Sequence, residues 1–277
     1  MTVRSSHLKL VGALGAAALT VGAIGAASPA LAAGHDLTYQ CTGQPVPLQA
    51  VDTTLNPGAI PAKMTAGQSV KNSMSLVVHL NQTQTGIAQA AGDSVDGKVV
   101  AKGPLAFKLN IPNTAIDQTL GATQDVTASG KGTITAAKAG KFKVNAGAIN
   151  ATLNLTRSGN TTTATQDCTA PTDGTQTLAT VTVAKDKTKS KVSAKGSGGK
   201  ATVTDKVKSH FGLVPTGKVK FTLKKGSKSV TAKGSLNKKG VAKISRSLSA
   251  GKYSITAKYA GDKNVKGSTG KGSVTVK

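Results

Sequence analysis

The sequence contains no tryptophan and no glutamate, and aromatic residues make up only 3% of its 277 residues. All eleven acidic residues are therefore aspartates. Glutamate is a good helix former, so its absence beside frequent threonine and valine argues against a helical architecture. The same absence excludes an active site built on two glutamates, or on a glutamate and an aspartate. The composition predicts an all-β protein with many turns.

Residues that build common catalytic and metal sites are also scarce. Of the four histidines, His79 and His210 lie far apart, in different predicted domains. The sequence displays no GxSxG motif, no Ser/His/Asp set and no cluster of metal ligands at a recognisable spacing. We therefore expect a protein that is not an enzyme and that uses no metal or other cofactor.

The N-terminal residues predict export from the cell. Arg4 and Lys9 precede the apolar run LVGALGAAALTVGAIGAA, and Ala30 and Ala32 then stand at the two positions of an A-x-A cleavage site. The run is long enough for a membrane anchor to be considered, but it consists mostly of glycine and alanine, which insert weakly. We predict a signal peptide over 1–32 and no transmembrane segment after its cleavage. A retained anchor is the alternative.

If the protein is exported, its two cysteines can form a disulfide, because disulfides persist in oxidising compartments. Two cysteines permit one internal pairing, Cys41 with Cys168. A bridge closing so long a loop stabilises a fold by about 4–5 kcal/mol in the chain-entropy model. Two free cysteines, or a bridge between chains, are the alternatives.

Between the cysteines, apolar residues recur at every second position. The segments PLAFKLNIP (104–112) and INATLNLT (149–156) place their large aliphatic residues on one face, and turn signals such as AGDSVDG separate the runs. Past Cys168 the chain becomes polar. We predict a β-sandwich domain over 33–168 and a linker over 169–184.

Positive charge is concentrated in the C-terminal part of the chain. The formal net charge is +25. Residues 34–168 contain ten Lys and Arg against seven Asp, a difference of +3, whereas residues 169–277 contain 24 against four, a difference of +20. Such an asymmetry favours a polyanionic partner. The alternative is a highly charged surface that keeps the protein soluble and binds nothing in particular.

These lysines alternate with apolar residues. In GKVKFTLKK (217–225) and GKYSITAKYAGD (251–262), an apolar residue occupies every second position and lysines fall between. A disordered basic arm would not keep this period. We therefore place the lysines on the solvent face and turns of a sheet. The candidate polyanion-binding residues are Lys218, Lys220, Lys224, Lys225, Lys238, Lys239, Lys252 and Lys258.

The order of motifs in this part resembles a known family, the bacterial Ig-like repeat. Its members run P-T-G-x-V-x-F, then G-x-A, then A-G-x-Y-x-[IV]-x-A-x-Y-x-G-D and a serine. The resemblance covers about 185–277 and implies a sandwich of about seven strands. Val265 departs from the pattern, which commonly has an aromatic there. The matching positions are Pro215, Thr216, Gly217, Val219, Phe221, Gly240, Ala242, Ala250, Gly251, Tyr253, Ile255, Ala257, Tyr259, Gly261, Asp262 and Ser268.

A fainter resemblance covers the N-terminal part. The segments TYQC, AIPAKMTAGQSV and QDC are similar to an uncharacterised secreted bacterial domain that opens with Y-x-C and closes with a second cysteine before Ig-like repeats. That resemblance implies an architecture of two all-β domains and no particular activity.

Two classes of function follow. The first is a secreted, non-enzymatic envelope protein, in which the Ig-like module is a spacer or an adhesion unit. The second is an electrostatic binder of wall teichoic acid, an anionic glycan or extracellular DNA. Base-specific nucleic-acid recognition is not expected, because residues 169–277 contain one arginine, Arg246, and few aromatics outside core positions. An accessory module of an exoenzyme is a third hypothesis. We expect a monomer.

Overall fold

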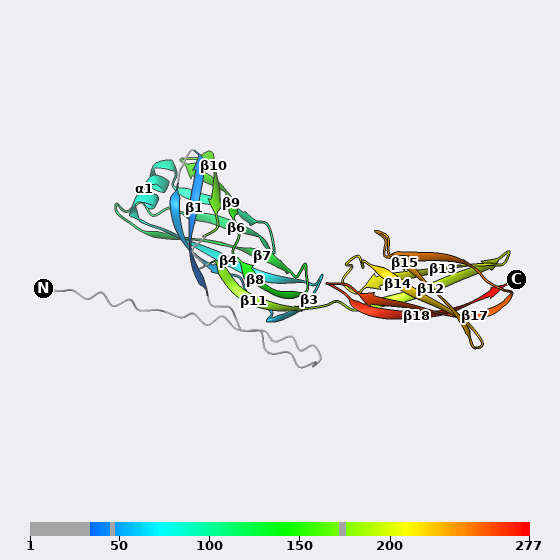
Figure 1. Cartoon of the computed structure of the whole chain (residues 1–277). Coiled ribbons are helices and arrows are strands. Elements are labelled where there is room, and N and C mark those ends of the chain that lie inside the picture. The colour runs from blue at the N-terminus through cyan, green and yellow to red at the C-terminus, as the bar shows by residue number, and fades with distance from the viewer. Residues whose placement is uncertain (1–33, 45–47, 172–175) are drawn as a thin grey trace, which may run out of the picture.

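The computed structural model describes residues 34–44, 48–171 and 176–277. The predicted signal peptide, 1–32, lies outside these residues. The all-β prediction is confirmed, since every described element except one short helix is a strand (Figure 1). None of the described helical residues forms a segment with the length and hydropathy needed to cross a membrane.

Eight antiparallel strands of the N-terminal part form a closed barrel, in the order β1-β10-β9-β5-β6-β7-β4-β2. A sandwich was predicted here. Alternation defines which face of a strand is buried, but it is the same in two stacked sheets and in one sheet closed on itself. The strands are β1 (His35–Gln44), β2 (Gln49–Asn56), β4 (Ser69–Leu80), β5 (Ser94–Ala101), β6 (Leu105–Ala115), β7 (Gln124–Thr135), β9 (Ile149–Arg157) and β10 (Asn160–Thr169).

The predicted disulfide is confirmed. Cys41 on β1 and Cys168 on β10 are bonded at an S–S distance of 2.06 Å. Because β1 is the first strand of the barrel and β10 the last, the bond joins the two ends of the barrel sequence where they meet.

A second, small sheet is built from two strands that lie between barrel strands in the sequence and from one strand after the barrel. Its last strand shows that the predicted linker, 169–184, is wrong over 177–184. The sheet consists of β3 (Lys63–Thr65), β11 (Thr177–Ala184) and β8 (Gly140–Asn145), with β11 in the middle. Residues 177–184 are thus a central strand, paired parallel to β3 and antiparallel to β8. The physical reason is the alternation in TLATVTVA, which buries Val181 and Val183.

The single described helix, α1 (Gln82–Ala91), was not predicted. Asn81 caps its N-terminus, and Gln84 completes a capping box. The buried Gln84 side chain also donates to the carbonyl oxygens of Leu48 and Ala50, at 3.0 and 2.6 Å. These bonds fix α1 against the start of β2, at one end of the barrel (Figure 1).

The C-terminal part is a sandwich of seven strands in two sheets, in the orders β12-β13-β16 and β15-β14-β17-β18. Val203, Phe221 and Ile255 are among the residues buried between the sheets. Both the strand number and the architecture agree with the prediction. The strands are β12 (Thr188–Ser197), β13 (Lys200–Ser209), β14 (Lys218–Lys225), β15 (Lys228–Ser235), β16 (Val241–Ser247), β17 (Gly251–Gly261) and β18 (Lys266–Val276).

Candidate functional site: the lysine face of the C-terminal sandwich

Three lysines stand in one row across the outer face of the four-stranded sheet. Lys220 on β14 pairs directly with Lys233 on β15 and with Lys258 on β17. All three are exposed. Neighbouring strands are about 4.8 Å apart, so the three ammonium groups share a narrow strip of surface. We call these residues the lysine row.

Other lysines extend the field along the same face. The strand positions between them hold threonine and serine, including Thr222, which pairs with Thr231 and Thr256. These hydroxyls add hydrogen-bonding capacity without negative charge. The additional exposed lysines on this face are Lys218, Lys224, Lys252 and Lys271.

The described part of the sandwich supplies no carboxylate to this face. Asp186 and Asp205 are buried, and Asp262 lies in the turn between β17 and β18. Like charges placed directly opposite each other destabilise a sheet. The lysine row therefore costs folding free energy that no neighbouring acid offsets.

Of the eight candidate lysines, five lie on this face: Lys218, Lys220, Lys224, Lys252 and Lys258. Sequence reasoning missed Lys233 and Lys271, although the same alternation in KSVTAKGSL and GSTGKGSVTV predicts outward positions.

Three candidates lie elsewhere. The Nζ of Lys225 donates to the carbonyl oxygen of Ala250 and lies 5.8 Å from the centre of the Tyr253 ring, so it is held at the sheet end. Lys238 and Lys239 lie in the turn between β15 and β16, at the end of the sheet away from Lys225.

The opposite sheet also carries lysines on its outer face. There Lys189 pairs with Lys208, and Lys191 pairs with Lys206. Positive charge thus covers both faces of the sandwich. The difference is that only the four-stranded sheet, among the described strands, aligns lysines over three successive strands.

Asp262 has a structural role in the sandwich. Its carboxylate accepts hydrogen bonds from the backbone N–H groups of Thr216, Asn264 and Val265 and from the Thr216 hydroxyl, at 2.8–3.0 Å. Partial burial acts to raise the pKa of Asp262, but these bonds outweigh it and lower the pKa from 3.8 to about 2. Through these hydrogen bonds the Asp262 carboxylate links the loop before β14 to the turn between β17 and β18.

The barrel carries a polar chain that the sequence did not reveal. On its outer surface, Asp125 Oδ1 lies 2.7 Å from His79 Nδ1, and His79 Nε2 lies 2.9 Å from the Thr54 hydroxyl. The three residues come from β7, β4 and β2, and only strand register brings them together. The expectation from the sequence concerned Ser/His/Asp sets only, and this chain uses a threonine in place of the serine.

The arrangement differs from an activated nucleophile. The Thr54 hydroxyl donates its proton to Asp36 Oδ1, at 2.7 Å, so its bond with His79 uses an oxygen lone pair. A catalytic histidine must instead accept that proton. His79 and Asp125 side chains are also 41% and 64% exposed, whereas such sites exclude water. Among the described residues, no group of three metal-ligating side chains is present either.

Comparison with known proteins agrees with the C-terminal fold. Residues 187–277 match the family model of the bacterial Ig-like domain (group 3). The strands β12 to β18 fill this range, so the C-terminal third of the chain is similar to a bacterial Ig-like domain in both sequence and strand content. The resemblance found in the sequence is confirmed.

Similarity over the whole chain is weak. A protein from Corynebacterium diphtheriae described as membrane-anchored is 12% identical, with a TM-score of 0.37; the match covers 88% of this chain and 59% of that one. Fibronectin(III)-like modules of CbhA from Clostridium thermocellum are 15% identical, with a TM-score of 0.25 and coverages of 81% and 94%. TM-scores of this size carry no functional argument. The chain matches no curated protein.

Proposed function

We propose that this chain is an exported, non-enzymatic protein of the bacterial envelope, and that its Ig-like domain attaches it to anionic polymers at the cell surface. The lysine row is the observation that carries the proposal. It places like charges opposite each other over three strands, at a cost in folding free energy. A polyanion laid across the row would neutralise these charges and release counterions.

The chemistry of the face favours recognition of charge over recognition of sequence. Lysine presents a compact ammonium group, which contacts phosphate or carboxylate as a point charge, whereas base recognition relies on the planar fork of arginine. Phe221, Tyr253 and Tyr259 are buried in the core of the sandwich and are not available for stacking on bases. The partner class is therefore a repeating anionic polymer.

The test compares two triple variants of the full chain with equal loss of charge. The first replaces Lys220, Lys233 and Lys258 by glutamine, and the matched control replaces Lys189, Lys191 and Lys208 on the other sheet. Retention on purified cell wall and on heparin is measured at about 50 mM and 200 mM salt, over which phosphate-bound complexes weaken steeply. We expect the lysine-row variant to elute at lower salt than the control.

The remaining outcomes separate the alternatives. Equal weakening in both variants would mean that net charge acts without a preferred face. If the unmodified chain binds neither wall nor heparin at low salt, the lysines only keep the protein soluble, and the Ig-like domain is a spacer.

A further inference from the structure

The interior of the barrel is packed at one end and hollow at the other. Leu55, Leu105, Leu109 and Ile134 are at most 1% exposed and fill one part of the interior. Beside α1, by contrast, the inward-facing residues Val78, Ala151 and Leu153 retain partial exposure, although they share a face with buried neighbours on their strands. This end of the barrel is incompletely filled.

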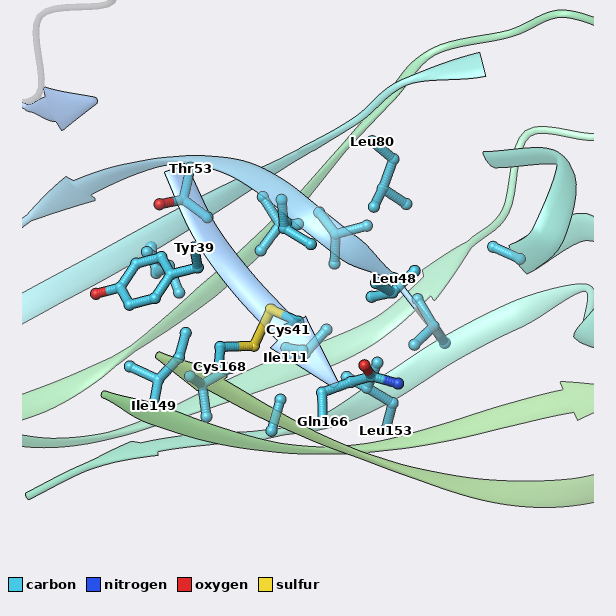
Figure 2. Close-up of a pocket in the computed structure, with 18 of the residues that line it drawn as sticks. Tyr39, Cys41, Leu48, Thr53, Leu80, Ile111, Ile149, Leu153, Gln166 and Cys168 are labelled. Carbon is cyan, nitrogen blue, oxygen red and sulfur yellow. A yellow bond between two sulfur atoms is a disulfide. The ribbon is translucent and has the colours of Figure 1, made fainter. Parts of the chain in front are cut away.

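A cavity of about 80 Å³ occupies the hollow end. Strands from all around the barrel contribute to its wall, and Ala88 closes it from α1. Figure 2 shows Leu48, Leu80 and Leu153 around the open space, with the Cys41–Cys168 disulfide forming part of the wall.

The described wall is entirely apolar where it meets the cavity. Three polar residues line it. The Tyr39 hydroxyl donates to the carbonyl oxygen of Gly147 at 3.2 Å, and the Thr53 hydroxyl donates to that of Leu37 at 3.1 Å. The third is the buried Gln166. No Lys, Arg, His, Asp or Glu is among the described lining residues. Water needs two to four polar partners to occupy such a space, so the wall favours hydrocarbon over water.

We propose that the barrel binds the end of one unbranched hydrocarbon chain, such as the terminal carbons of a lipid acyl chain. A closed barrel of eight strands is the size that can hold one small ligand. The space is about half the ~150 Å³ cavity that takes up benzene, so it is too small for a ring and holds only the last few carbons of a chain. With no counter-charge inside, the polar head of the ligand stays at the open end, beside Val78 and Leu153.

Binding is tested on the full, disulfide-bonded chain with cis-parinaric acid, a linear fluorescent acyl probe. Linear alkanols of two to eight carbons then compete for the site. We expect saturable probe binding, and a competitor affinity that rises about fourfold per methylene until the chain outgrows the cavity. A cage-shaped alcohol such as 1-adamantanemethanol should not compete. Absence of saturable probe binding, or competition by the cage alcohol as strong as that of hexanol, would overturn the proposal.

Paired variants on β9 locate the site. Ala151→Leu adds bulk inside the cavity and should weaken probe binding at least tenfold, whereas Thr152→Leu puts the same side chain on the exposed outer face of the same strand and should change nothing. Ala88→Leu fills the cavity from α1 and replaces the first variant if that one does not fold. Equal binding by filled and control variants would show that the probe binds elsewhere, against the proposal.

Discussion

Cys41 and Cys168 occupy directly opposing positions on β1 and β10, with their Cα atoms 3.9 Å apart although 127 residues separate them in sequence. The bond fastens neighbouring strands at the point where the barrel closes. Everything between the two cysteines, including the cavity wall except Tyr39, belongs to one covalent loop.

Removing this bond should loosen the barrel alone. A Cys41→Ala, Cys168→Ala double variant should lower the barrel's free energy of unfolding by up to about 4–5 kcal/mol, because its unfolded chain regains the entropy of a long open loop. The unfolding transition of the Ig-like domain should stay in place, since distant units contribute independently. Calorimetry measures both transitions. Thiol titration of the unfolded, unreduced protein should find no free thiol, and one or two free thiols would contradict the assignment.

The position of β11 predicts where the N-terminal unit can be cut. A fragment ending at residue 168 loses the strand that separates β3 from β8, and so exposes Val144, which is fully buried in the intact chain. A fragment ending at residue 184 keeps it. We expect the longer fragment to melt cooperatively and the shorter one to melt at lower temperature or to aggregate. Equal melting temperatures of the two fragments would show that β11 does not contribute to the stability of the N-terminal unit.

The predictable parts of the fold were those that depend on alternation. Alternation placed Val219, Phe221 and Leu223 in a core and the intervening lysines outside, and the order of motifs identified the Ig-like domain. It could not distinguish a barrel from a sandwich, because closure depends on which strands pair. The strand TLATVTVA was assigned to a linker because it follows the polar stretch after Cys168, although its own residues keep a period of two.

The sites show the same limit. The lysines were visible in the sequence, but the row of Lys233, Lys220 and Lys258 exists through strand register, and so does the contact of His79 with Asp125. The helix α1 had a local signal, asparagine followed three residues later by glutamine, that was overlooked. The cavity had none, because an inward alanine such as Ala151 appears in the sequence as an ordinary core position.

Asp262 should make the Ig-like domain sensitive to acid. Its pKa is lowered from 3.8 to about 2 in the folded state, so the stability that it contributes is complete above about pH 4 and is lost as the pH falls toward 2. Asp262→Asn should lower the free energy of unfolding by about 1–3 kcal/mol at pH 7, because charge-assisted bonds to Thr216, Asn264 and Val265 are weakened.

The measurement is urea unfolding of the two proteins between pH 2 and pH 7. The curves of stability against pH should converge at the acid end, since protonation removes in the parent what the substitution removes in the variant. Burial raises the pKa of Asp205, which works in the opposite direction and is common to both proteins. Parallel curves over the whole range would mean that Asp262 does not titrate as the hydrogen bonds require.

The lysine row should respond to salt in opposite ways in folding and in binding. Lys220 lies between Lys233 and Lys258, so Lys220→Gln removes two cross-strand repulsions and should raise the free energy of unfolding of the Ig-like domain by about 0.2–1 kcal/mol at low salt. Near 1 M salt the Debye length falls to about 3 Å, and this gain should disappear. Thr222→Gln, on the same face of β14 but without a change of charge, is the control.

Retention of the same Lys220 variant on an anionic polymer should be weaker than that of the parent. A variant that folds more stably and binds less well would identify a charge kept for a partner; a variant that is less stable at low salt would show that Lys220 serves the fold, and that the row is not a binding surface maintained at the expense of stability.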